Sequence, residues 1–416
     1  MIYLVFIPII GPILALFIGP YLLLKRSRVY DFILVMIFGR LANPVMYSYI
    51  ENYSVIWWIS IYSSLVISLL FKQRKNNTEI NKGTRFFVIL IFVFTISSSF
   101  SLNSFLSLFK LLNWVILTIL FILNSKYFNY DTKNISKFLY ALIITSVLTL
   151  PYPFIAYARD GQGFQGVFNH PQAFAVFVAV LSVFLIDRAT KLKSLRNKKN
   201  YFFLFIIIIL IYLTKARTGF LILTSIFLTT FLELIYNFTT LRLHKLKKIF
   251  PKILKITGLL ILLVLLSGLF LDQDKLKLFV LKKDEKTTLS ESFEKSRGFI
   301  ILQQWNNFTK EPMLGIGFGI AKSDTHEQEI QTFNGIPISA ATEKANLPLT
   351  LLEETGVIGL LAFIPLFFFV TKNIGDEKFL WIGFIVSNFS EVTFFSYGSF
   401  GLIAGVLIAK TITLKK

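Results

Sequence analysis

The 416-residue chain contains no cysteine, so it can form no disulfide, no thiolate metal site and no cysteine nucleophile. Histidine is also rare. The three histidines are His170, His244 and His326, and they lack the spacing of a His-Glu-x-x-His zinc motif. The sequence has neither a Walker loop nor a dinucleotide-binding glycine fingerprint. We therefore expect no metal site and no cofactor.

Charged residues make up only 16% of the chain, whereas 55% of the residues are hydrophobic and 46 are phenylalanine. This composition is too apolar for a soluble domain of this length. Open sheets are excluded from lipid because their edge groups would be unsatisfied. The sequence predicts an all-α polytopic membrane protein with about 12–13 transmembrane helices, each of about 20 mostly apolar residues. The candidate spans are 1–24, 29–50, 54–71, 86–100, 105–124, 136–157, 171–187, 201–214, 219–237, 256–271, 347–371, 378–393 and 396–411.

The net charge of +20 is concentrated in short basic turns at 25–28, 72–75, 188–199 and 242–255. In a soluble protein this charge would favour nucleic acid, but here it follows the rule that basic turns stay in the cytoplasm. An even number of candidate spans separates consecutive basic turns, so one orientation satisfies all of them. Residues 272–345 carry 11 acidic and 10 basic residues, and this orientation places them outside the cytoplasm. We expect a lipid bilayer and no nucleic acid as partner.

The chain accordingly divides into three parts: transmembrane helices at 1–271, a large extracytoplasmic loop at 272–345, and C-terminal transmembrane helices at 346–416. Within the loop, apolar spacing over 291–309 predicts a helix. Glycines in 313–320 predict a series of turns, and we expect 321–345 to be irregular. A simple conduit would have little need of such a loop, whereas a membrane enzyme acting on a bulky polar substrate would.

Four arginines are candidates for binding a diphosphate, because guanidinium stays charged and pairs bidentately with phosphate oxygens. Arg217 lies between two apolar stretches, which is costly unless its charge is paired or hydrated. The alternative is an anchor at the membrane interface. Arg297 lies in the helical part of the loop, where the alternative is a solvated surface charge. Arg40 and Arg159 are further outward cations, although a single arginine on that side is common.

His170 is a candidate catalytic base at the outer start of a predicted span. The alternative is purely structural. Asn169 would cap the helix and Pro171 would occupy its first turn, as both residue types commonly do.

Carboxylates flank the start of the predicted span 347–371, which follows the large loop. Glu343, or its neighbour Lys344, could take the proton of an attacking hydroxyl. Alternatively, Glu343 could complement the positive end of the helix dipole. Glu353 and Glu354 lie about two turns inside the apolar run, so we expect them to face the protein interior or a wet cavity.

Four motifs follow one another in the chain: Gly166–Gln172 (GVFNHPQ), Ala216–Gly219 (ARTG), Glu311–Gly319 (EPMLGIGFG), and the run that begins Asn346-Leu347-Pro348-Leu349 and continues to Leu360. Each motif alone is weak, but the combination and its order are specific. Over about residues 160–370, the chain resembles the O-antigen ligase and O-antigen polymerase family of bacterial envelope proteins. The first 150 residues match that family only in being hydrophobic.

The resemblance implies a transferase that moves a glycan from undecaprenyl diphosphate to a glycan or lipid acceptor, at the outer face of the bacterial cytoplasmic membrane. It implies that Arg217 and Arg297 hold the diphosphate. The family has a histidine, proposed as the base, where this chain has Ala345, so Glu343 or Lys344 would have to substitute. The family motif also includes Gly315, Gly317, Asn346, Glu354 and Gly356.

Three alternatives remain open at this point. Ligase and polymerase share donor and motifs and differ only in the acceptor. A flippase or other transporter of lipid-linked glycans would also have many spans and intramembrane arginines. A non-catalytic component working with other polysaccharide assembly proteins would tolerate loss of the expected histidine.

Overall fold

A computed structural model describes residues 1–71, 82–130, 133–158, 163–191, 196–240, 258–259, 298–320, 330–333, 336–340, 344–389 and 392–413. The chain divides into two compact units. The first unit comprises residues 1–64, 129–285 and 376–387, and the second comprises 65–128, 286–375 and 388–416. Each unit is described by itself.

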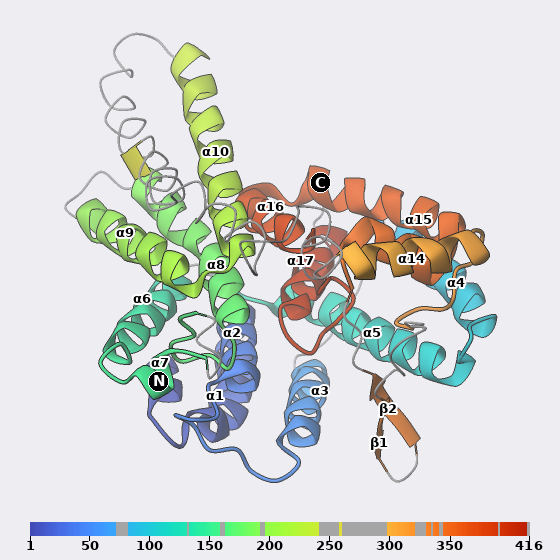
Figure 1. The fold of residues 1–416 in the computed structure, drawn as a ribbon, viewed down its shortest axis with the longest axis horizontal. Helices are drawn as coiled ribbons and strands as arrows, with labels where there is room; N and C mark the ends of the chain where they lie inside the picture. The colour runs from blue at the N-terminus through green and yellow to red at the C-terminus, as the bar shows by residue number, and fades with distance from the viewer. Residues whose placement is uncertain are drawn as a thin grey trace, which may run out of the picture. The chain divides into compact units, whose positions relative to one another are not determined.

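The first unit is a bundle of helices around α2 and α8 (Figure 1). Helix α8 packs against α6, α9, α10 and α16, and α1 packs against α2. Its elements are η1 (Ile2–Phe6), α1 (Gly11–Arg26), α2 (Val29–Leu41), α3 (Tyr53–Phe71, up to Ser64), α6 (Lys133–Leu148), α7 (Pro153–Ala156), α8 (Pro171–Lys191), α9 (Arg196–Thr214), α10 (Arg217–Thr240) and α16 (Lys378–Ser387).

Two spans expected near the N-terminus are shorter in the structure. Helix α2 ends at Leu41 rather than continuing to residue 50. The helix ends here because Pro44 disfavours helical backbone at the residue before it. The Asn43 side chain also accepts the N–H of Val45 at 2.9 Å. Helix α1 likewise starts only at Gly11, after a 3-10 turn, with proline in its first turn.

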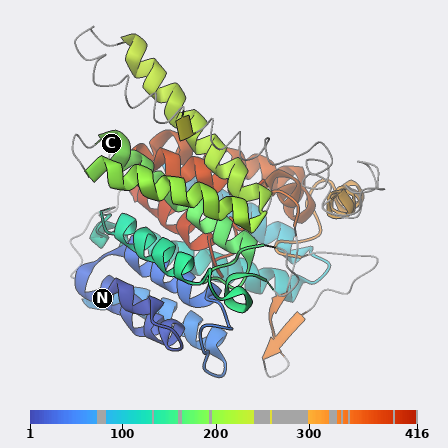
Figure 2. The same ribbon diagram turned by 60° about the vertical axis from the view of Figure 1, so that its left-hand side comes forward.

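In the second unit, α15 packs on α4 and α14, and α17 packs on α5 (Figures 1 and 2). Phe94, Trp114 and Phe395 form an aromatic cluster with Phe318 of the large loop. The elements are α4 (Lys82–Ser99), α5 (Ser104–Asn124), η2 (Ser125–Tyr127), α14 (Phe299–Lys310), β1 (Ile330–Phe333), β2 (Ile336–Ala340), α15 (Leu347–Asn373), η4 (Gly375–Glu377), which follows α15 and begins at the last residue of this unit, and α17 (Gly401–Thr413).

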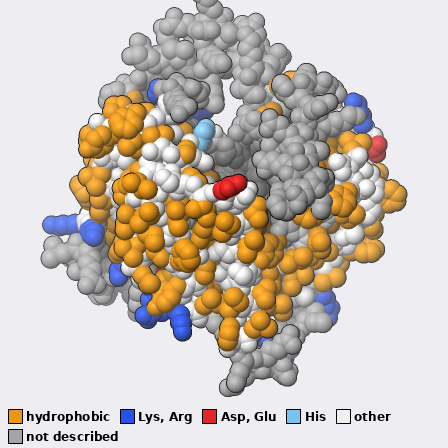
Figure 3. All heavy atoms as spheres, turned by 90° about the horizontal axis from the view of Figure 1, so that it is seen from below, with side chains coloured by type: hydrophobic (Ala, Val, Ile, Leu, Met, Phe, Trp, Pro, Cys, Tyr) orange, Lys and Arg blue, Asp and Glu red, His pale blue; other side chains and the backbone are white. Residues whose placement is uncertain are grey.

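Within the described residues, five helices are long and apolar enough to cross a membrane: Tyr53–Phe71, Lys82–Ser99, Ser104–Tyr127, Pro171–Ala189 and Leu347–Asn373. Large apolar side chains point outward, as a lipid-facing surface requires; Phe17 and Phe92 are 69% and 66% exposed. Hydrophobic side chains cover most of the described surface in Figure 3. The chain is an all-α polytopic membrane protein, as predicted. Most of the candidate span 256–271 lies outside the described residues.

The large loop contains more order than the sequence predicted. Helix α14 confirms the described part of the helix expected over 291–309. In contrast, the segment expected to be irregular contains an antiparallel hairpin, in which Ile330 pairs with Ala340 and Phe333 with Ile336. The strands are only four and five residues long, and β2 packs against α5. Their sequences lack the strict apolar–polar alternation that predicts a strand, so the hairpin could not be recognised from the pattern.

Candidate functional site

Helix α15 is broken at Gly356, whose φ of 64° and ψ of −169° lie outside the helical region. This backbone conformation is essentially restricted to glycine. A continuous helix would pair the N–H groups of Val357 and Ile358 with the carbonyls four residues earlier. The break separates these pairs, and unpaired backbone groups are costly in a membrane-spanning helix.

The glycine-rich part of the large loop supplies the missing partners. Two carbonyls of residues 312–317 accept from the helix, and two N–H groups donate to it. The four backbone hydrogen bonds are Val357 N to Pro312 O (2.9 Å), Ile358 N to Met313 O (3.3 Å), Ile316 N to Glu353 O (2.9 Å) and Gly317 N to Glu354 O (3.0 Å). The loop therefore completes the broken helix.

Glycine is required at these contacts for steric reasons. Gly315 and Gly317 have φ angles of 70° and 115°, which other residues rarely adopt. A Cβ atom on Gly315 would lie 2.6 Å from the carbonyl oxygen of Glu353. A Cβ on Gly317 would collide with the Ser101 side chain, and one on Gly356 would collide with the Met313 carbonyl.

Side chains of α4, of α5 and of the turn between them also hold this loop. Each of these side chains donates a hydrogen bond to a carbonyl of the loop, so the loop is held at several positions. The pairs are Ser97 Oγ to Leu314 O (2.6 Å), Ser101 Oγ to Ile316 O (2.9 Å), Ser107 Oγ to Phe318 O (3.0 Å) and Lys110 Nζ to Gly319 O (2.6 Å). The sequence analysis missed all four residues; only Lys110, a lone charge inside a predicted span, carried a signal.

A buried ionic cluster lies where the loop meets α15. Lys344 Nζ is 2.6 Å from Glu353 Oε2 and 3.4 Å from Glu354 Oε1, and it donates to the Ile320 carbonyl at 2.6 Å. Glu354 also accepts the N–H of Gly319 at 2.9 Å. Both carboxylates face the interior, as expected from their position in the span. Buried charges persist only when paired and hydrogen-bonded, and here each one is.

Helix α14 contributes two amides to this cluster. Gln304 Nε2 donates to Glu353 Oε2 at 2.9 Å, and Asn307 Nδ2 donates to Glu353 Oε1 at 2.7 Å. Gln304 Oε1 in turn accepts the N–H of Ala345 at 3.0 Å. The position where a histidine was expected is therefore a buried alanine, 2% exposed, held through its backbone.

The start of α15 is capped as its sequence indicates. The Asn346 side chain accepts the N–H of Leu349 at 3.0 Å, which is the usual role of asparagine at this position. Of the residues singled out from the sequence, the second unit thus brings together Lys344, Asn346, Glu354, Gly356, Gly315 and Gly317.

In the first unit, residues 163–170 tie several helix ends together. Phe164 N donates to the Leu213 carbonyl at 2.9 Å, at the end of α9. Asn169 N donates to the Leu41 carbonyl at 2.8 Å, at the end of α2. The buried Asn43 side chain donates to the carbonyls of Ile155 and Gly166. The segment therefore links the helix ends that carry Arg40, His170 and Arg217.

Arg40 lies in the last turn of α2, half-buried. Its guanidinium donates to Ser54 Oγ and lies 5.7 Å from the centre of the Trp57 ring. Nearby, the Tyr49 hydroxyl donates to the Ala42 carbonyl at 2.7 Å. Burial raises the pKa of Tyr49 to about 12, so this phenol remains a donor at neutral pH. A cation at the C-terminal end of a helix is also favoured by the dipole.

His170 immediately precedes α8, and its side chain is exposed. Its Nδ1 accepts the N–H of Gln172 at 3.2 Å. This turn therefore has a structural role. The His170 side chain caps the helix, and Pro171 lies in its first turn. This contact needs an unprotonated Nδ1.

Arg217 is the first residue of α10, and its side chain is exposed. The preceding Lys215 has a φ of 56°, and Ala216 N donates to Thr214 Oγ1 at 3.1 Å. This turn sets Arg217 at the positive end of a helix dipole, where a cation is unfavourable and an anion is favoured.

Three residues singled out from the sequence, Arg159, Arg297 and Glu343, lie outside the described residues. In the part of the chain that the structure describes, no group of three or more His, Cys, Asp or Glu side chains is arranged to hold a metal ion.

The fold and its motifs define a multi-pass membrane protein whose large loop is built into a broken transmembrane helix. Residues 202–364 match the family described as O-antigen ligase. This similarity supports the resemblance found in the sequence. It supports a glycan transferase of the O-antigen ligase or polymerase type. No curated protein sequence matches the chain.

Proposed function

We propose that this protein transfers an oligosaccharide or polysaccharide from undecaprenyl diphosphate to a glycan or lipid acceptor, at the outer face of the bacterial cytoplasmic membrane. The observation that carries the proposal is the family match over 202–364. That region contains Arg217, Arg297 and the loop that completes α15.

The diphosphate is held by arginines. Arg217 supports this role because it is exposed at the N-terminus of α10, where the helix dipole favours an anion. Arg297 is the proposed second ligand from the large loop, and Arg40 and Arg159 are secondary candidates. Arg40 is already engaged with Ser54 and Trp57, so a small contribution is expected from it.

The transfer is a single displacement at the anomeric carbon, with inversion. The acceptor hydroxyl oxygen forms the new glycosidic bond. The bond from the anomeric carbon to the diphosphate breaks, and undecaprenyl diphosphate leaves with the electron pair. Preorganised guanidinium groups stabilise the charge that develops on the leaving group. No metal is needed in this scheme.

The hydroxyl proton goes to a base. Lys344 is paired with two carboxylates, so as an ammonium it positions the end of the loop and accepts no proton. Glu343, the residue before it, is the proposed base. His170, whose side chain is exposed, is the second candidate; its Nδ1 must release the N–H of Gln172 before it can take the proton. The ionic cluster supports this arrangement because it fixes the end of the loop against α15.

The test is glycan transfer by the purified, reconstituted protein from a lipid-diphosphate-linked donor. Arg217→Ala and Arg297→Ala should each lower the rate by about 10²–10³-fold, the usual cost of losing a charge-stabilising group. Lys310→Ala, at the exposed end of α14, is the matched control and should retain full activity. A chelator should change nothing.

Comparing the pH–rate profiles of Glu343→Gln and His170→Gln identifies the base. Only the variant that lacks the true base should lose the limb that reports its titration. Full activity of both arginine variants would refute the proposal. Transport of the donor without any transfer would identify a flippase instead. The glycan profile of a deletion strain then separates polymerase from ligase. Unit-length chains indicate a lost polymerase, and free lipid-linked polymer indicates a lost ligase.

A further inference from the structure

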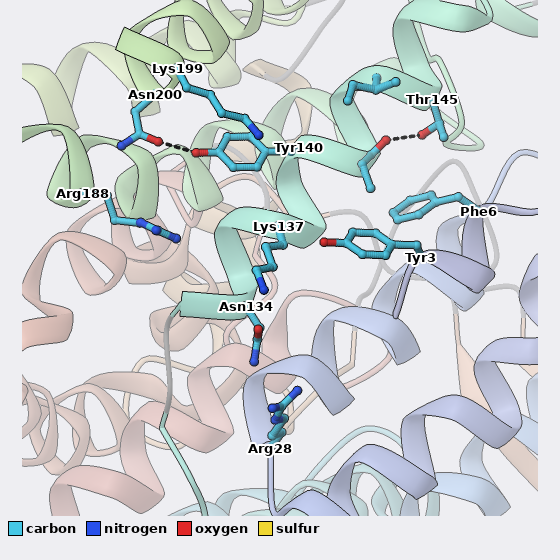
Figure 4. Close-up of a pocket in the computed structure, with 12 residues that line it drawn as sticks. Tyr3, Phe6, Arg28, Asn134, Lys137, Tyr140, Thr145, Arg188, Lys199 and Asn200 are labelled. Carbon is cyan, nitrogen blue, oxygen red and sulfur yellow. Dashed lines mark hydrogen bonds between the residues drawn. The ribbon is translucent and has the colours of Figure 1, made fainter. Parts of the chain in front are cut away.

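A cavity of about 920 Å³ opens within the first unit (Figure 4), and its lining includes none of Arg40, His170 and Arg217. It lies along α6, between η1, the junction of α1 and α2, the end of α8 and the start of α9. Neither the family match nor the proposed transfer reaction uses it.

One part of the cavity is strongly cationic. Arg28, Lys137, Arg188 and Lys199 all line it, and no acidic residue is among the described residues of its wall. Arg28 is only partly neutralised, by an ion pair of 3.6 Å with Asp31. Lys199 lies over the Tyr140 ring at 4.4 Å. Four cationic side chains around one space attract an anion to it.

A buried donor faces the same wall. Asn200 lines the cavity and is 2% exposed, yet its Nδ2 has no hydrogen-bond partner among the residues that the structure describes. The other end of this amide is fixed, because Asn200 Oδ1 accepts from the Tyr140 hydroxyl. A buried amide N–H without an acceptor is costly, so the wall offers both charge and a directed donor to an anionic oxygen.

Another part of the cavity wall carries apolar side chains, next to Thr145. Phe6, Ala141 and Ile144 line it, and Ile144 is 50% exposed. Along α6, Ile144 lies two turns beyond Lys137, roughly 10 Å. Leu148, one turn further on, is 65% exposed. The site therefore changes from cationic to apolar along one helix, as the headgroup and the first part of an acyl chain would require.

We propose that this cavity binds an anionic phospholipid. The phosphate lies among Arg28, Lys137 and Arg188, and one acyl chain runs along α6 toward Ile144. Arg28 and Arg188 belong to the basic turns 25–28 and 188–199, which the charge pattern assigns to the cytoplasmic side. Basic pockets between helices on that side are suited to anionic headgroups.

The experiment measures lipid retained by the detergent-purified full chain, using native mass spectrometry with phosphatidylglycerol and phosphatidylcholine. Lys137→Gln combined with Arg188→Gln should weaken phosphatidylglycerol binding by about 30-fold, because each cation near a headgroup contributes about 1 kcal/mol. The control is Lys25→Gln with Arg26→Gln. It removes the same amount of charge, but from exposed residues that lie outside the cavity in the basic turn of Arg28. The control should bind as the unchanged protein does.

Two further arms make the result decisive. Lys137→Arg with Arg188→Lys keeps both charges and should keep binding, which shows that any loss is not a folding defect. Glycerol phosphate, which has the headgroup chemistry but no acyl chain, should fail to displace the lipid. Displacement by glycerol phosphate at the lipid's own concentration would make the site one for free phosphate and overturn the proposal. Equal retention of the two lipids, or an equal loss in the control, would also overturn it.

Discussion

Replacing Gly356 by alanine tests whether the loop and the broken helix depend on each other. Gly356 has a φ of 64° and a ψ of −169°, and its Cβ would collide with the Met313 carbonyl. Alanine can relieve the collision in two ways. Either α15 becomes a continuous helix, or the loop moves away while the break remains. Both outcomes release the loop residues Ile316 and Gly317 from α15.

The magnitude follows from the hydrogen bonds. Four backbone bonds join the loop to the helix, each worth about 1 kcal/mol net. If α15 becomes continuous, two of them are replaced within the helix and the loss is about 2 kcal/mol. If the helix stays broken, all four are lost and the cost is about 4 kcal/mol. Transfer activity should fall in either case, because the loop no longer has a fixed position.

The assay is hydrogen exchange of the peptide that contains Ile316 and Gly317, together with thermal unfolding. Loss of about 2 kcal/mol should speed exchange of these amides by about 30-fold. Gly375→Ala is the control, since Gly375 has the same φ of 64° but no atom within 4 Å of an added Cβ. It should show only the backbone cost of about 1–2 kcal/mol and no faster exchange in the loop. Unchanged exchange at Ile316 and Gly317 in the Gly356→Ala protein would refute the reasoning.

Two further predictions concern buried polar groups. Lys344→Met leaves the Glu353 carboxylate buried without its cation and should destabilise the protein by about 3–5 kcal/mol. Adding Glu353→Gln should restore most of that loss in denaturant unfolding, and a double variant no more stable than Lys344→Met would contradict the pairing. Asn43→Asp removes both donors to the carbonyls of Ile155 and Gly166. It should cost at least about 2 kcal/mol, and an unchanged unfolding midpoint would show that these bonds carry no weight.

The helices were the most predictable part of the molecule. Long apolar runs define spans whatever their neighbours are, because the requirement is to satisfy the backbone within one segment. Local chemistry also located a helix start, because Pro171 was expected in the first turn of α8. The end of α2 was missed because an apolar run continues past Leu41, although Asn43 and Pro44 stop the helix.

The arrangement of the candidate site was only partly predictable. Glu353 and Glu354 could be assigned to the interior, since a carboxylate in an apolar run has no other stable place. Their partners could not be assigned, because Gln304, Lys110 and Lys344 are distant in sequence or look like ordinary loop residues. The sequence suggested Asn169 as the cap of α8, whereas in the structure the His170 side chain caps this helix. The difference depends on a side-chain rotamer, which spacing in the sequence does not specify.

Two of the four motifs that carried the family resemblance, Glu311–Gly319 and the run that begins at Asn346, are separate in the chain but contact each other in the structure. Without the glycine-rich turn, α15 would have four unpaired backbone groups at Gly356 and would become continuous. Without the break in α15, the turn would lose the partners that hold Ile316 and Gly317. The same contact region also fixes Lys344 through Glu353 and the Ile320 carbonyl. The large loop is therefore joined to a transmembrane helix, and Lys344 is held there by hydrogen bonds. This explains why both motifs must be present together, whatever side chain takes the proton.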